Sequence, residues 1–495
     1  MELFTILLFL ILTWFLIRAI SSITRKSSGD LPPGPKRLPI IGNLHQLGAK
    51  PHKSLTELAK IHGPLMSLKL GQVTTIVVSS AAMAKEVLQT HDKLLCSRTI
   101  PDALYVNEHH TMGLPWIPVS DLWRNLRTIC NTQLFAAKVL DSNQNLRRRK
   151  VQELFDEMLK RSKAGEAVDI GRAAFTSTLN QLSNTIFSVD LADPDSDLAK
   201  EFKITTWNIM KEAGTPNLSD YFPLLKKIDP QGVRRRMGIN FKKIIDLFDG
   251  VIDERLRVRE ARDCIMNNDM LDTLLNIAEE SGELNRTQIN QLIMVLFVAG
   301  TDTTAATFQW AMAELLRNPG ILSKARAELE QIIGRGNPVE ESDIARLPYL
   351  QAIVKETLRL HPVGPLLLPR RAEADVKIAG FTVPEGAQIF INVWAIGRDP
   401  NTWDDPNSFK PERFLGSELD VKGRNFELLP FGGGRRICPG LPLAMRILHL
   451  VLGNFIHSFD WKLENGIKLE EVDMEDKFGI TLEMAHPLRA IPSTL

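Results

Sequence analysis

The sequence predicts a mainly α-helical fold with small β-sheets, arranged as a single globular domain behind an N-terminal transmembrane anchor. Apolar residues recur at helical spacing, with charged residues on the opposite faces, from about residue 82 to residue 359. Short strand-like runs lie before and after this helical region. No internal repeat or low-complexity tract divides the chain, so one helix-rich body fits the pattern better than several domains.

The anchor is expected at residues 1–20. Most of this stretch is uncharged and strongly apolar, and snorkelling of Arg18 extends it toward the roughly 20 residues that span a bilayer. Glu2 precedes the apolar run, whereas Arg25 and Lys26 follow it, so the charge bias places the C-terminal side in the cytoplasm. A cleaved signal peptide is the alternative, but it would carry its positive charges before the apolar run.

Residues 21–38 are expected to form a basic and proline-rich hinge, followed by the globular body at residues 39–495. The run of prolines and glycine at residues 31–35 cannot be helical, because proline lacks the N–H group and restricts the residue before it. Proline-rich segments are more often plain linkers or ligands of a partner. Placed directly after an anchor, this one is expected to orient the body against the membrane surface.

Residues 64–80 predict a β-hairpin, because two apolar runs flank a turn at Gly71. Long amphipathic helices are expected at residues 144–163, 198–212, 235–262 and 287–317. Further short strands are expected at residues 376–381, 388–392, 478–482 and 488–492. The small sheets are thus expected at the two ends of a helical body.

Composition limits the classes of function. Basic and acidic side chains nearly balance, at 60 and 59, so the net charge of +1 gives no reason to expect nucleic-acid binding. The cysteines lie far apart and form no disulfide framework: Cys96, Cys130, Cys264 and Cys438. The globular body is therefore expected in the cytosol.

The residues that carry chemistry are densest between residues 430 and 440, where Cys438 lies among glycines and arginines. Pro439 follows and opens an apolar helical run at residues 441–455, so Cys438 is expected at the N-cap of that helix. There the free N–H groups and the helix dipole stabilise a thiolate. Glycines let backbone N–H groups face the sulfur and let a flat cofactor approach, while Arg436 could hold a cofactor carboxylate.

A thiolate ligand to haem iron, which favours O–O cleavage, is the interpretation that fits this setting best. A lone cysteine is more often a buried structural residue, but the surrounding glycines and arginines weigh against that role. Zinc would need a second cysteine or a histidine nearby, and a phosphate loop would need Gly-Lys-Ser/Thr after a strand. Neither feature accompanies Cys438.

Five residues of this segment fill the pattern Phe-x-x-Gly-x-Arg-x-Cys-x-Gly, namely Phe431, Gly434, Arg436, Cys438 and Gly440. The pattern resembles the haem-binding signature of the haem-thiolate monooxygenases, the cytochrome P-450 superfamily. The resemblance implies a P-450 fold over residues 39–495 and haem b bound through Cys438. It also implies dioxygen as co-substrate and an NADPH–cytochrome P-450 reductase as partner, whose flavin passes on the electrons. That reductase would dock on the surface around Cys438, through basic side chains such as Arg435.

A second constellation lies in a long apolar helix expected from an N-cap at Thr287 to about Asn318. Its middle contains Gly300, Asp302 and Thr303, although glycine costs about 1 kcal/mol in a helix and an unpaired buried aspartate costs more. Gly300 is expected to let a flat ligand lie against the backbone, and Asp302 and Thr303 to relay protons to dioxygen. The string resembles the distal-helix motif of the P-450 family, which implies the same roles. The alternative is that the threonines only donate to carbonyls one turn back and bend the helix.

Two arginine motifs resemble the positions that hold the haem propionates in this family. Trp123 and Arg127 lie four residues apart, a spacing that commonly reflects packing alone, and resemble the Trp-x-x-x-Arg clamp. Arg370, in Leu-Pro-Arg, matches another propionate position. The resemblance therefore implies cofactor contacts for all three residues.

Glu356 and Arg359 lie three residues apart on one helix face, which alone indicates an ordinary surface pair. With Arg413 in a downstream Pro-Glu-Arg-Phe string, they resemble the buried Glu–Arg–Arg network that braces the proximal side of P-450 enzymes. The resemblance implies a structural role for these three residues rather than a catalytic one.

The substrate pocket is expected above the haem, between residues 100–118, 296–304, 361–368 and 478–481. Its expected wall is apolar: Phe297, Ala299, Val363, Leu366, Leu367 and Ile480. No charged anchor stands out besides Glu108, His109 and His110, for which exposure to solvent is the simpler interpretation. Such a pocket suits a lipophilic ligand whose orientation depends on shape, such as a terpenoid or a phenolic.

Over nearly the whole chain the sequence resembles the plant geraniol 8-hydroxylase (geraniol 10-hydroxylase) group, in residues 51–55, 66–72, 151–154, 229–232, 395–399 and 485–490. The likeness implies hydroxylation of geraniol or a related monoterpenol at an allylic methyl, in plant secondary metabolism. It also implies a single-pass enzyme of the endoplasmic reticulum membrane with a cytosolic catalytic domain. Related enzymes oxidise diterpenes, prenylated quinols and phenolics, so these substrates remain alternatives.

Two other classes of function stay open. A haem-thiolate isomerase or dehydratase would rearrange peroxides without activating oxygen, and it would not need Asp302 and Thr303. A non-catalytic haem carrier would want a second axial ligand, yet no methionine or histidine stands in the middle of the distal helix.

Overall fold

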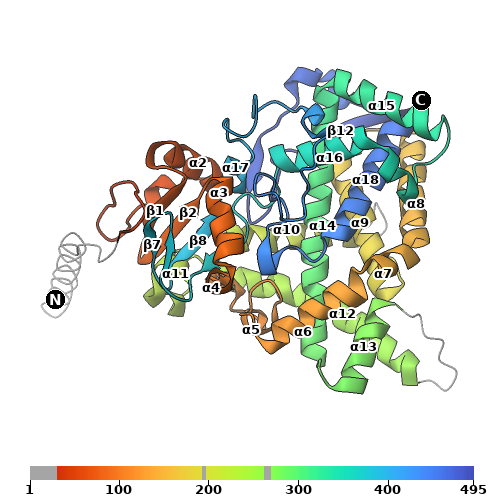
Figure 1. Ribbon diagram of the computed structural model, residues 1–495. Coiled ribbons are helices and arrows are strands. Elements are labelled where there is room, and N and C mark those ends of the chain that lie inside the picture. The colour runs from red at the N-terminus through yellow and green to blue at the C-terminus, as the bar shows by residue number, and fades with distance from the viewer. Residues whose placement is uncertain (1–29, 192–196, 261–268) are drawn as a thin grey trace, which may run out of the picture.

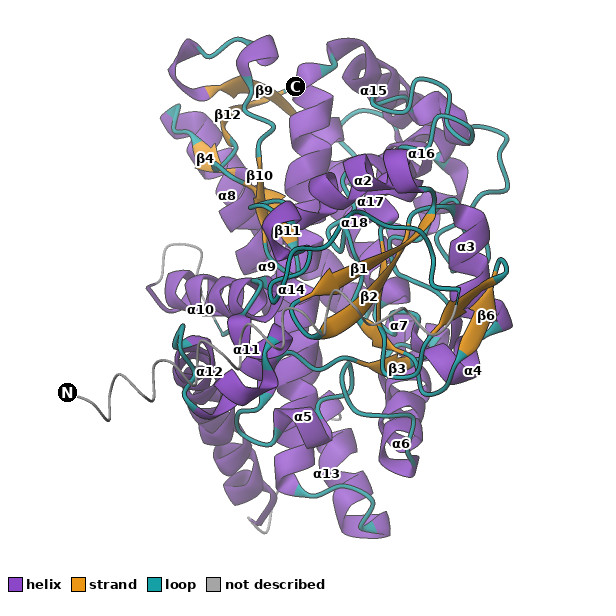
Figure 2. Ribbon diagram, turned by 90° about the vertical axis from the view of Figure 1, so that its left-hand side faces the viewer, coloured by secondary structure: helices purple, strands orange, loops and turns teal. Residues whose placement is uncertain are grey.

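The computed structural model describes residues 30–191, 197–260 and 269–495. The expected anchor at residues 1–20 and the first part of the expected hinge lie outside the described residues. Within them helices predominate and the strands are short, as the sequence predicts. Most strands gather in two groups on opposite sides of the helical body, and one hairpin lies between them (Figures 1 and 2).

The long helices predicted from the sequence are confirmed with small differences at their ends. In chain order the helices are α2 (Pro51–His62), α3 (Ala81–Lys85), α4 (Asp92–Leu95), α5 (His109–Met112), α6 (Asp121–Ile129), α7 (Ala137–Ser142), α8 (Gln144–Ala164), α9 (Ile170–Phe187), α10 (Asp197–Gly214), α11 (Leu218–Tyr221), α12 (Val233–Glu260), α13 (Met270–Ser281), α14 (Arg286–Arg317), α15 (Pro319–Ile333), α16 (Pro348–Leu360), α17 (Val393–Ile396) and α18 (Leu441–Ser458).

Helix α14 runs through the middle of the body, and α9, α12, α16 and α18 pack against it (Figure 1). It starts after Asn285, not after Thr287 as predicted, because Asn285 and Gln288 form a reciprocal capping box that satisfies the first free N–H groups. It ends at Asn318 as predicted. Of the described helices, α14 alone is long and apolar enough to cross a membrane, but most of it is buried inside the protein, as in a core helix.

The strands form four small sheets. The predicted hairpin is confirmed as β1 (Leu65–Leu70) and β2 (Val73–Val78), which pair antiparallel from Leu65–Val78 to Leu70–Val73. It continues into a five-stranded sheet of order β1-β2-β8-β5-β3, in which β2 and β8 are parallel. A three-stranded sheet of order β4-β12-β9 and the pairs β6-β7 and β10-β11 complete the set. The remaining bounds are β3 (Ser97–Arg98), β4 (Val168–Asp169), β5 (Arg370–Arg371), β6 (Val376–Ile378), β7 (Phe381–Val383), β8 (Gln388–Ile391), β9 (Phe459–Leu463), β10 (Asp476–Phe478), β11 (Leu482–Met484) and β12 (Arg489–Thr494).

Two of the predicted strands are in fact hairpins. Residues 376–381 divide into β6 and β7, because Ala379 and Gly380 take positive φ values and turn the chain. Residues 478–482 contain the turn between β10 and β11 rather than a strand. This turn lies on α10, where the N–H of Ile480 donates to the carbonyl oxygen of Met210 at 3.0 Å. The turn thereby carries residues 480 and 481 into the centre of the molecule.

The described part of the proline-rich segment is extended, without helix, as predicted. It lies along β1: the N–H of Ser67 donates to the carbonyl oxygen of Pro33 at 2.8 Å, and the Ser67 hydroxyl donates to that of Pro32 at 2.6 Å. Gly34 allows this approach, because a Cβ there would lie 1.9 Å from the Ser67 carbonyl oxygen. The segment therefore enters the body as an extra, non-strand edge of the first sheet.

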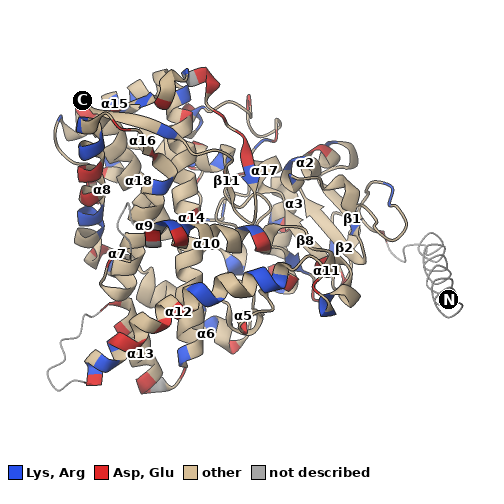
Figure 3. Ribbon diagram, turned by 180° about the vertical axis from the view of Figure 1, so that it is seen from behind, with Lys and Arg blue, Asp and Glu red and all other residues tan. Residues whose placement is uncertain are grey.

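Charged side chains of both signs are interspersed along the outer helices, for example α8 and α12 (Figure 3). Several form ion pairs one turn apart, such as Arg161 with Glu157 at 2.6 Å and Lys242 with Asp246 at 3.0 Å. Mixed charge of this kind is typical of solvated helix faces and agrees with the balanced composition.

Candidate active site

A cavity of about 370 Å³ lies between α14 and the loop that carries Cys438. Its wall is mostly apolar and comes from segments that are far apart in the sequence. The Cys438 loop and the start of α18 line one side, and α14 lines the other together with parts of α5, α10 and α12. The loop after α16, the turn between β10 and β11, α6 and residues 114–116 also contribute to the wall.

Cys438 lies in this wall, two residues before the N-cap of α18. The N-cap is Gly440 and Pro442 stands in the first turn, so the predicted N-cap position of Cys438 is wrong by two residues. The predicted environment of the sulfur is nevertheless present, because the N–H groups of Gly440 and Leu441 donate to it. Burial raises the pKa of the Cys438 thiol, while these N–H groups and the charge of Arg127 act in the opposite direction. A metal cation bound at this sulfur would deprotonate it outright.

The glycines of the Cys438 loop differ in whether the backbone requires a glycine. Gly434 has a φ of +68°, and a Cβ on it would lie 2.3 Å from the carbonyl oxygen of Leu88. Only glycine therefore lets the loop pack this closely. Gly440 has an ordinary φ of −78°, and a Cβ there would make normal contact with the Cys438 sulfur at 3.8 Å. Phe431 lines the cavity and accepts the N–H of Cys438 at 3.0 Å, which closes the loop.

Arginine side chains reach the same cavity from four elements: Arg98, Arg127, Arg370 and Arg436. Arg436 donates to the carbonyl oxygens of Cys96 at 2.5 Å and Ile117 at 2.6 Å. Its guanidinium lies 5.2 Å from the ring centroid of Trp123. Burial, together with the charges of Arg370 and Arg127, lowers the pKa of Arg436 to about 10. The cavity edge is therefore rich in positive charge that the protein only partly compensates.

Arg127 and Arg370 differ in how they are held. Arg127, on α6, has no hydrogen-bond or ion-pair partner among the described residues. Arg370 donates to Asp92 Oδ1 at 3.0 Å and to the carbonyl oxygen of Gly433 at 3.2 Å. In the described part of the chain, Asp92 is the one carboxylate that forms an ion pair with these four arginines. Arg370 thus braces the Cys438 loop, whereas Arg127 is free for a ligand.

The polar centre of α14 faces two directions. Thr303 lines the cavity, and its hydroxyl donates to the carbonyl oxygen of Ala299 at 2.6 Å. Thr301 and Thr307 make the same bond one turn back, at 2.8 Å each. The threonines therefore do donate to carbonyl oxygens one turn back, as the alternative interpretation holds. Thr303, however, also offers its hydroxyl oxygen to the cavity as an acceptor. Gly300 lines the cavity as well, yet a Cβ on it would lie 2.8 Å from Leu182, so the missing side chain makes room for α9.

Asp302 points away from the cavity. Its Oδ2 accepts from the Thr481 hydroxyl at 2.7 Å, and it shares a hydrogen bond with Glu483 on β11. Burial and the neighbouring Asp302 raise the pKa of Glu483 well above the usual carboxyl range. Lys477 is the cross-strand neighbour of Glu483 and acts in the opposite direction. Thr481 lines the cavity, so its hydroxyl links the carboxyl pair to the cavity wall.

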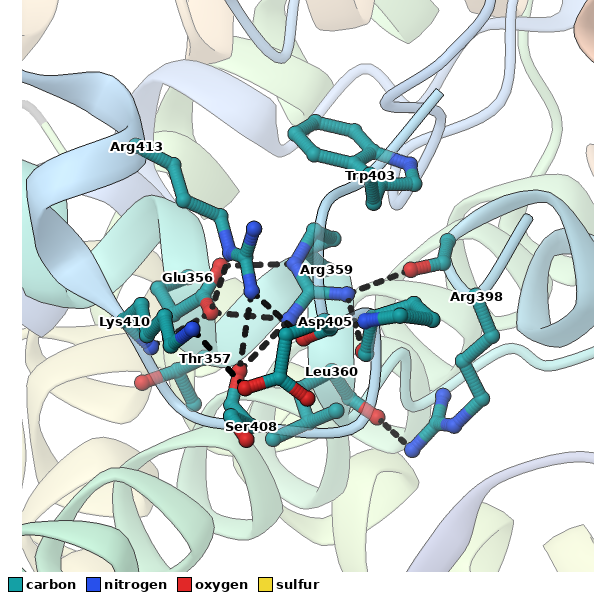
Figure 4. Close-up of polar contacts among 12 residues, drawn as sticks. Glu356, Thr357, Arg359, Leu360, Arg398, Trp403, Asp405, Ser408, Lys410 and Arg413 are labelled. Carbon is teal, nitrogen blue, oxygen red and sulfur yellow. Dashed lines mark hydrogen bonds and ion pairs between the residues drawn. The ribbon is translucent and has the colours of Figure 1, made fainter. Parts of the chain in front are cut away.

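The predicted Glu–Arg–Arg network is assembled between α16 and the segment of residues 397–413 (Figure 4). Arg359 donates to both oxygens of Glu356, at 2.6 and 2.8 Å, and Arg413 donates to Glu356 Oε1 at 3.2 Å. The N–H of Lys410 also donates to Oε1, at 2.7 Å. The remaining donors of Arg359 reach carbonyl oxygens of Gly397, Pro406 and Ser408. Glu356 is fully buried, so this is a structural network that holds the segment from residue 397 to residue 413 on α16.

The expected pocket residues divide into two groups. Ala299, Val363, Leu367 and Ile480 line the cavity. Phe297 and Leu366 do not, which corrects the prediction. Phe297 faces α9 and α12, where its ring lies 5.5 Å from Phe187 and 4.7 Å from Phe248. Leu366 packs in the cluster beside β1 and β2, whereas the next residue, Leu367, lines the cavity.

Residues 32–484 match the sequence model of the cytochrome P450 family. The chain belongs to this family. It is 57% identical to the geraniol 8-hydroxylase of Swertia mussotii over 492 residues, 99% of each chain. It is 56% identical to the geraniol 8-hydroxylase of Catharanthus roseus over 496 residues, all of both chains. A geranylhydroquinone 3''-hydroxylase of Arnebia euchroma is 50% identical over 495 residues, 99% of each chain. The protein is therefore a P-450 monooxygenase of the kind that hydroxylates plant terpenoids and phenolics.

Membership of the P-450 family implies haem bound through a cysteine thiolate. The cavity fits such a group. One wall presents the Cys438 sulfur with two N–H donors, and the edge presents arginines whose charge exceeds that of the single paired carboxylate, Asp92. A flat apolar ring that carries two carboxylates would supply both the apolar contact and the missing negative charge.

Several residues of the P-450 cavity were not singled out from the sequence. Arg98 belongs to a two-residue strand and donates to the carbonyl oxygens of Pro115 and Leu368, at 3.1 and 2.7 Å. Leu182, Ile209, Met210, Ala213 and Phe241 come from α9, α10 and α12. No local pattern marks them, because the amphipathic spacing of a helix shows which face is buried but not what it is buried against. His109, for which solvent exposure was expected, is only 3% exposed and lines the cavity.

Proposed function

We propose that this chain hydroxylates geraniol or a closely related monoterpenol at an allylic methyl. One C–H bond of the methyl is replaced by C–O–H, the second oxygen atom of dioxygen leaves as water, and NADPH supplies the two electrons. The observation that carries the proposal is the identity of more than half of all residues with two geraniol 8-hydroxylases over the full length of both. The apolar cavity supports it, since such a wall suits a small lipophilic ligand.

Cys438 is proposed as the axial ligand of haem b. Trp123, Arg127 and Arg436 are proposed to hold its propionates, with Arg370 acting mainly on the loop through Asp92 and Gly433. Phe431, Gly434 and Gly440 are proposed to give the loop the shape that presents Cys438: Phe431 accepts the N–H of Cys438, and Gly434 lets the loop pack on Leu88. The haem supplies the activation of dioxygen, which the side chains of the protein cannot provide.

The residues opposite Cys438 are proposed to manage protons. Thr303 offers a hydroxyl oxygen to the cavity, and Asp302 with Glu483 and Thr481 forms a buried carboxyl and hydroxyl group behind it. Thr303 would position a proton at the reacting oxygen, and Asp302 would exchange protons with it through the Thr481 side or through water. A haem-thiolate isomerase would have no use for this set of groups.

The electrons are proposed to come from a membrane-bound NADPH–cytochrome P-450 reductase. Arg435 exposes about half of its side chain, 52%, beside the Cys438 loop, where an acidic partner would dock. The apolar N-terminal residues and the proline-rich segment that follows them support an endoplasmic reticulum anchor with the catalytic body in the cytosol. The segment joins β1 directly, so the anchor would tether the body close to the membrane.

A prenylated quinol is the second candidate substrate class. The Arnebia euchroma relative is named for hydroxylation of geranylhydroquinone and is 50% identical over 99% of each chain. The reacting part of such a substrate is the same geranyl chain, so the same apolar wall would serve both.

Incubation of microsomes that contain this chain, a plant P-450 reductase and NADPH tests the proposal. Geraniol and geranylhydroquinone are given separately, with and without oxygen, and products are identified by mass spectrometry against synthetic standards. We expect an oxygen-dependent and NADPH-dependent diol from geraniol. Turnover of geranylhydroquinone alone would move the proposal to quinols. Conversion without NADPH would indicate an isomerase, and haem binding without any turnover would indicate a carrier.

A further inference from the structure

His109 stands out in the cavity because its wall is otherwise mostly apolar away from the arginines. The residue begins α5, is 3% exposed, and lines the cavity. Its Nδ1 lies 2.7 Å from Gln291 Oε1 on α14, and its ring meets Phe241 edge-on at 5.0 Å. Gly113 leaves room for the ring, since a Cβ there would lie 2.6 Å from His109 Cε1 and 2.7 Å from Nε2. The imidazole is therefore fixed in position from three sides.

The hydrogen bonds also fix its tautomer. Gln291 Nε2 donates to the carbonyl oxygen of Asn107 at 2.8 Å, and a carbonyl oxygen only accepts. The Gln291 amide is thus oriented with its oxygen toward His109, so Nδ1 carries the hydrogen and donates it. Nε2 is left with its lone pair and has no protein partner among the described residues. Burial lowers the pKa of His109 to about 4, so the ring stays neutral near pH 7.

We propose that Nε2 of His109 accepts a hydrogen bond from the hydroxyl group of the bound terpenoid alcohol. The inference rests on the proposed function and narrows it to substrates that carry a hydroxyl group at the end remote from the oxidised carbon. A ligand without a donor would displace water from this acceptor and leave it unpaired, so a ligand that supplies a donor is favoured over one that does not.

The position of α5 gives this contact a consequence for regiochemistry. Helix α5 packs against α14, whereas Cys438 lies in the loop before α18. Geraniol carries its hydroxyl group at one end and two allylic methyls at the other. An alcohol held at His109 would leave the far methyls free to reach the part of the cavity that Cys438 lines, which the proposal assigns to the reaction.

The test compares affinity for geraniol with affinity for 2,6-dimethylocta-2,6-diene, the same skeleton without the hydroxyl group. Dissociation constants are taken from the shift of the haem absorption band and, independently, from equilibrium dialysis of the haem-loaded full-length protein. We expect the wild-type protein to prefer geraniol by roughly tenfold, the size of one well-formed hydrogen bond. We expect His109→Phe, which keeps a ring but has no acceptor, to lose that preference while its affinity for the hydrocarbon stays within about twofold.

His110→Phe is the matched control, because it makes the same change one residue away on a ring that stacks on Tyr105 at 4.5 Å and does not line the cavity. Gln291→Leu keeps the histidine but removes the partner that fixes its tautomer, and should lower the preference by a smaller factor. This second variant decides the matter if His109→Phe fails to hold haem.

Three outcomes overturn the inference. The preference for geraniol persists in His109→Phe and in Gln291→Leu, or both ligands weaken equally, or the wild-type protein binds the pair with equal affinity. In each case the proposed function is tested independently, because hydroxylation of geraniol is measured by its product and not by ligand affinity. A wild-type protein that binds neither ligand would remove both.

Discussion

The two sides of the cavity differ in how their polar groups are paired. On the Cys438 side, most polar groups are paired within the protein: Arg359 uses its donors on Glu356 and three carbonyl oxygens, and Arg370 is tied to Asp92, although Arg127 has no partner among the described residues. On the opposite side, Thr303 and His109 keep an acceptor open toward the cavity. The Cys438 side is therefore expected to be rigid around a ligand atom. The opposite side is expected to form hydrogen bonds with the bound ligand or with water.

The largest effect expected from this comparison is that of removing the Cys438 sulfur on haem binding. Cys438→Ala removes the one side-chain atom in the wall that can bind haem iron as a thiolate, so we expect the absorption band of the reduced, carbon-monoxide-treated protein to disappear from its thiolate position. Cys96→Ala is the control, because Cys96 is also buried but only its backbone carbonyl is used by Arg436. A normal thiolate band in Cys438→Ala would disprove the assignment.

The next effect tests whether the Cys438 side is held by its buried network. Glu356→Ala leaves Arg359 buried without its carboxylate partner, which should cost about 3–5 kcal/mol of unfolding free energy and release haem. Denaturant unfolding with haem absorbance as a second probe measures both. Glu57→Ala breaks an exposed ion pair with Lys60 of the same spacing and should cost less than about 1 kcal/mol. Equal losses in the two variants would mean that burial adds nothing to the network.

The sequence predicts the two sides of the cavity to different extents. The Cys438 side depends on short motifs, so Glu356, Arg359, Arg413 and the loop glycines could be placed before the structure was seen. The N-cap at Gly440 and the bonds of Arg370 to Asp92 and Gly433 were not predicted, because they depend on backbone geometry and on residues far away in the sequence. The opposite wall is assembled by tertiary packing, which a helical pattern does not encode.

For three residues of α5 and α14, the sequence pattern did not predict the direction of the side chain or its partner. Phe297 is apolar and lies among cavity residues in the sequence, yet the helical rotation of 100° per residue turns it toward α9 and α12. His109 looked like a solvent-exposed histidine, because its partner Gln291 is 182 positions away. Asp302 was expected to face dioxygen beside Thr303, but adjacent helix positions face different directions, and it meets Glu483 instead.

The third prediction concerns the open side. Thr303→Ala removes the hydroxyl oxygen that α14 offers to the cavity, so we expect NADPH consumption to continue while product per NADPH falls by about tenfold and peroxide rises. The loss should remain below the hundredfold typical of a missing general acid, since water can enter the space. Stopped assays of NADPH, product and peroxide give the coupling ratio.

Thr301→Ala is the matched control for that variant. Thr301 makes the same bond to a carbonyl one turn back, at 2.8 Å, but does not line the cavity. It should therefore share any effect on helix stability and leave coupling unchanged. Unchanged coupling in Thr303→Ala, or equal uncoupling in both variants, would show that the hydroxyl acts only on the helix.

The smallest expected effect lies behind the open side, at the carboxyl pair of Asp302 and Glu483. Because burial and Asp302 raise the pKa of Glu483, the folded protein holds a proton there that the unfolded chain has already lost, and stability falls as pH rises from the usual carboxyl range toward the raised pKa. Glu483→Gln mimics the protonated form and should flatten this decline, while stability at the acidic end changes little. Thermal unfolding followed across this pH range measures the slope. Glu464→Gln, at a half-buried carboxylate whose pKa is lowered by its hydrogen bonds to Arg489, should leave the slope in place. If Glu483→Gln kept the wild-type slope, the pair would hold no shared proton, and the acid behind Thr303 would have to draw its protons from water alone.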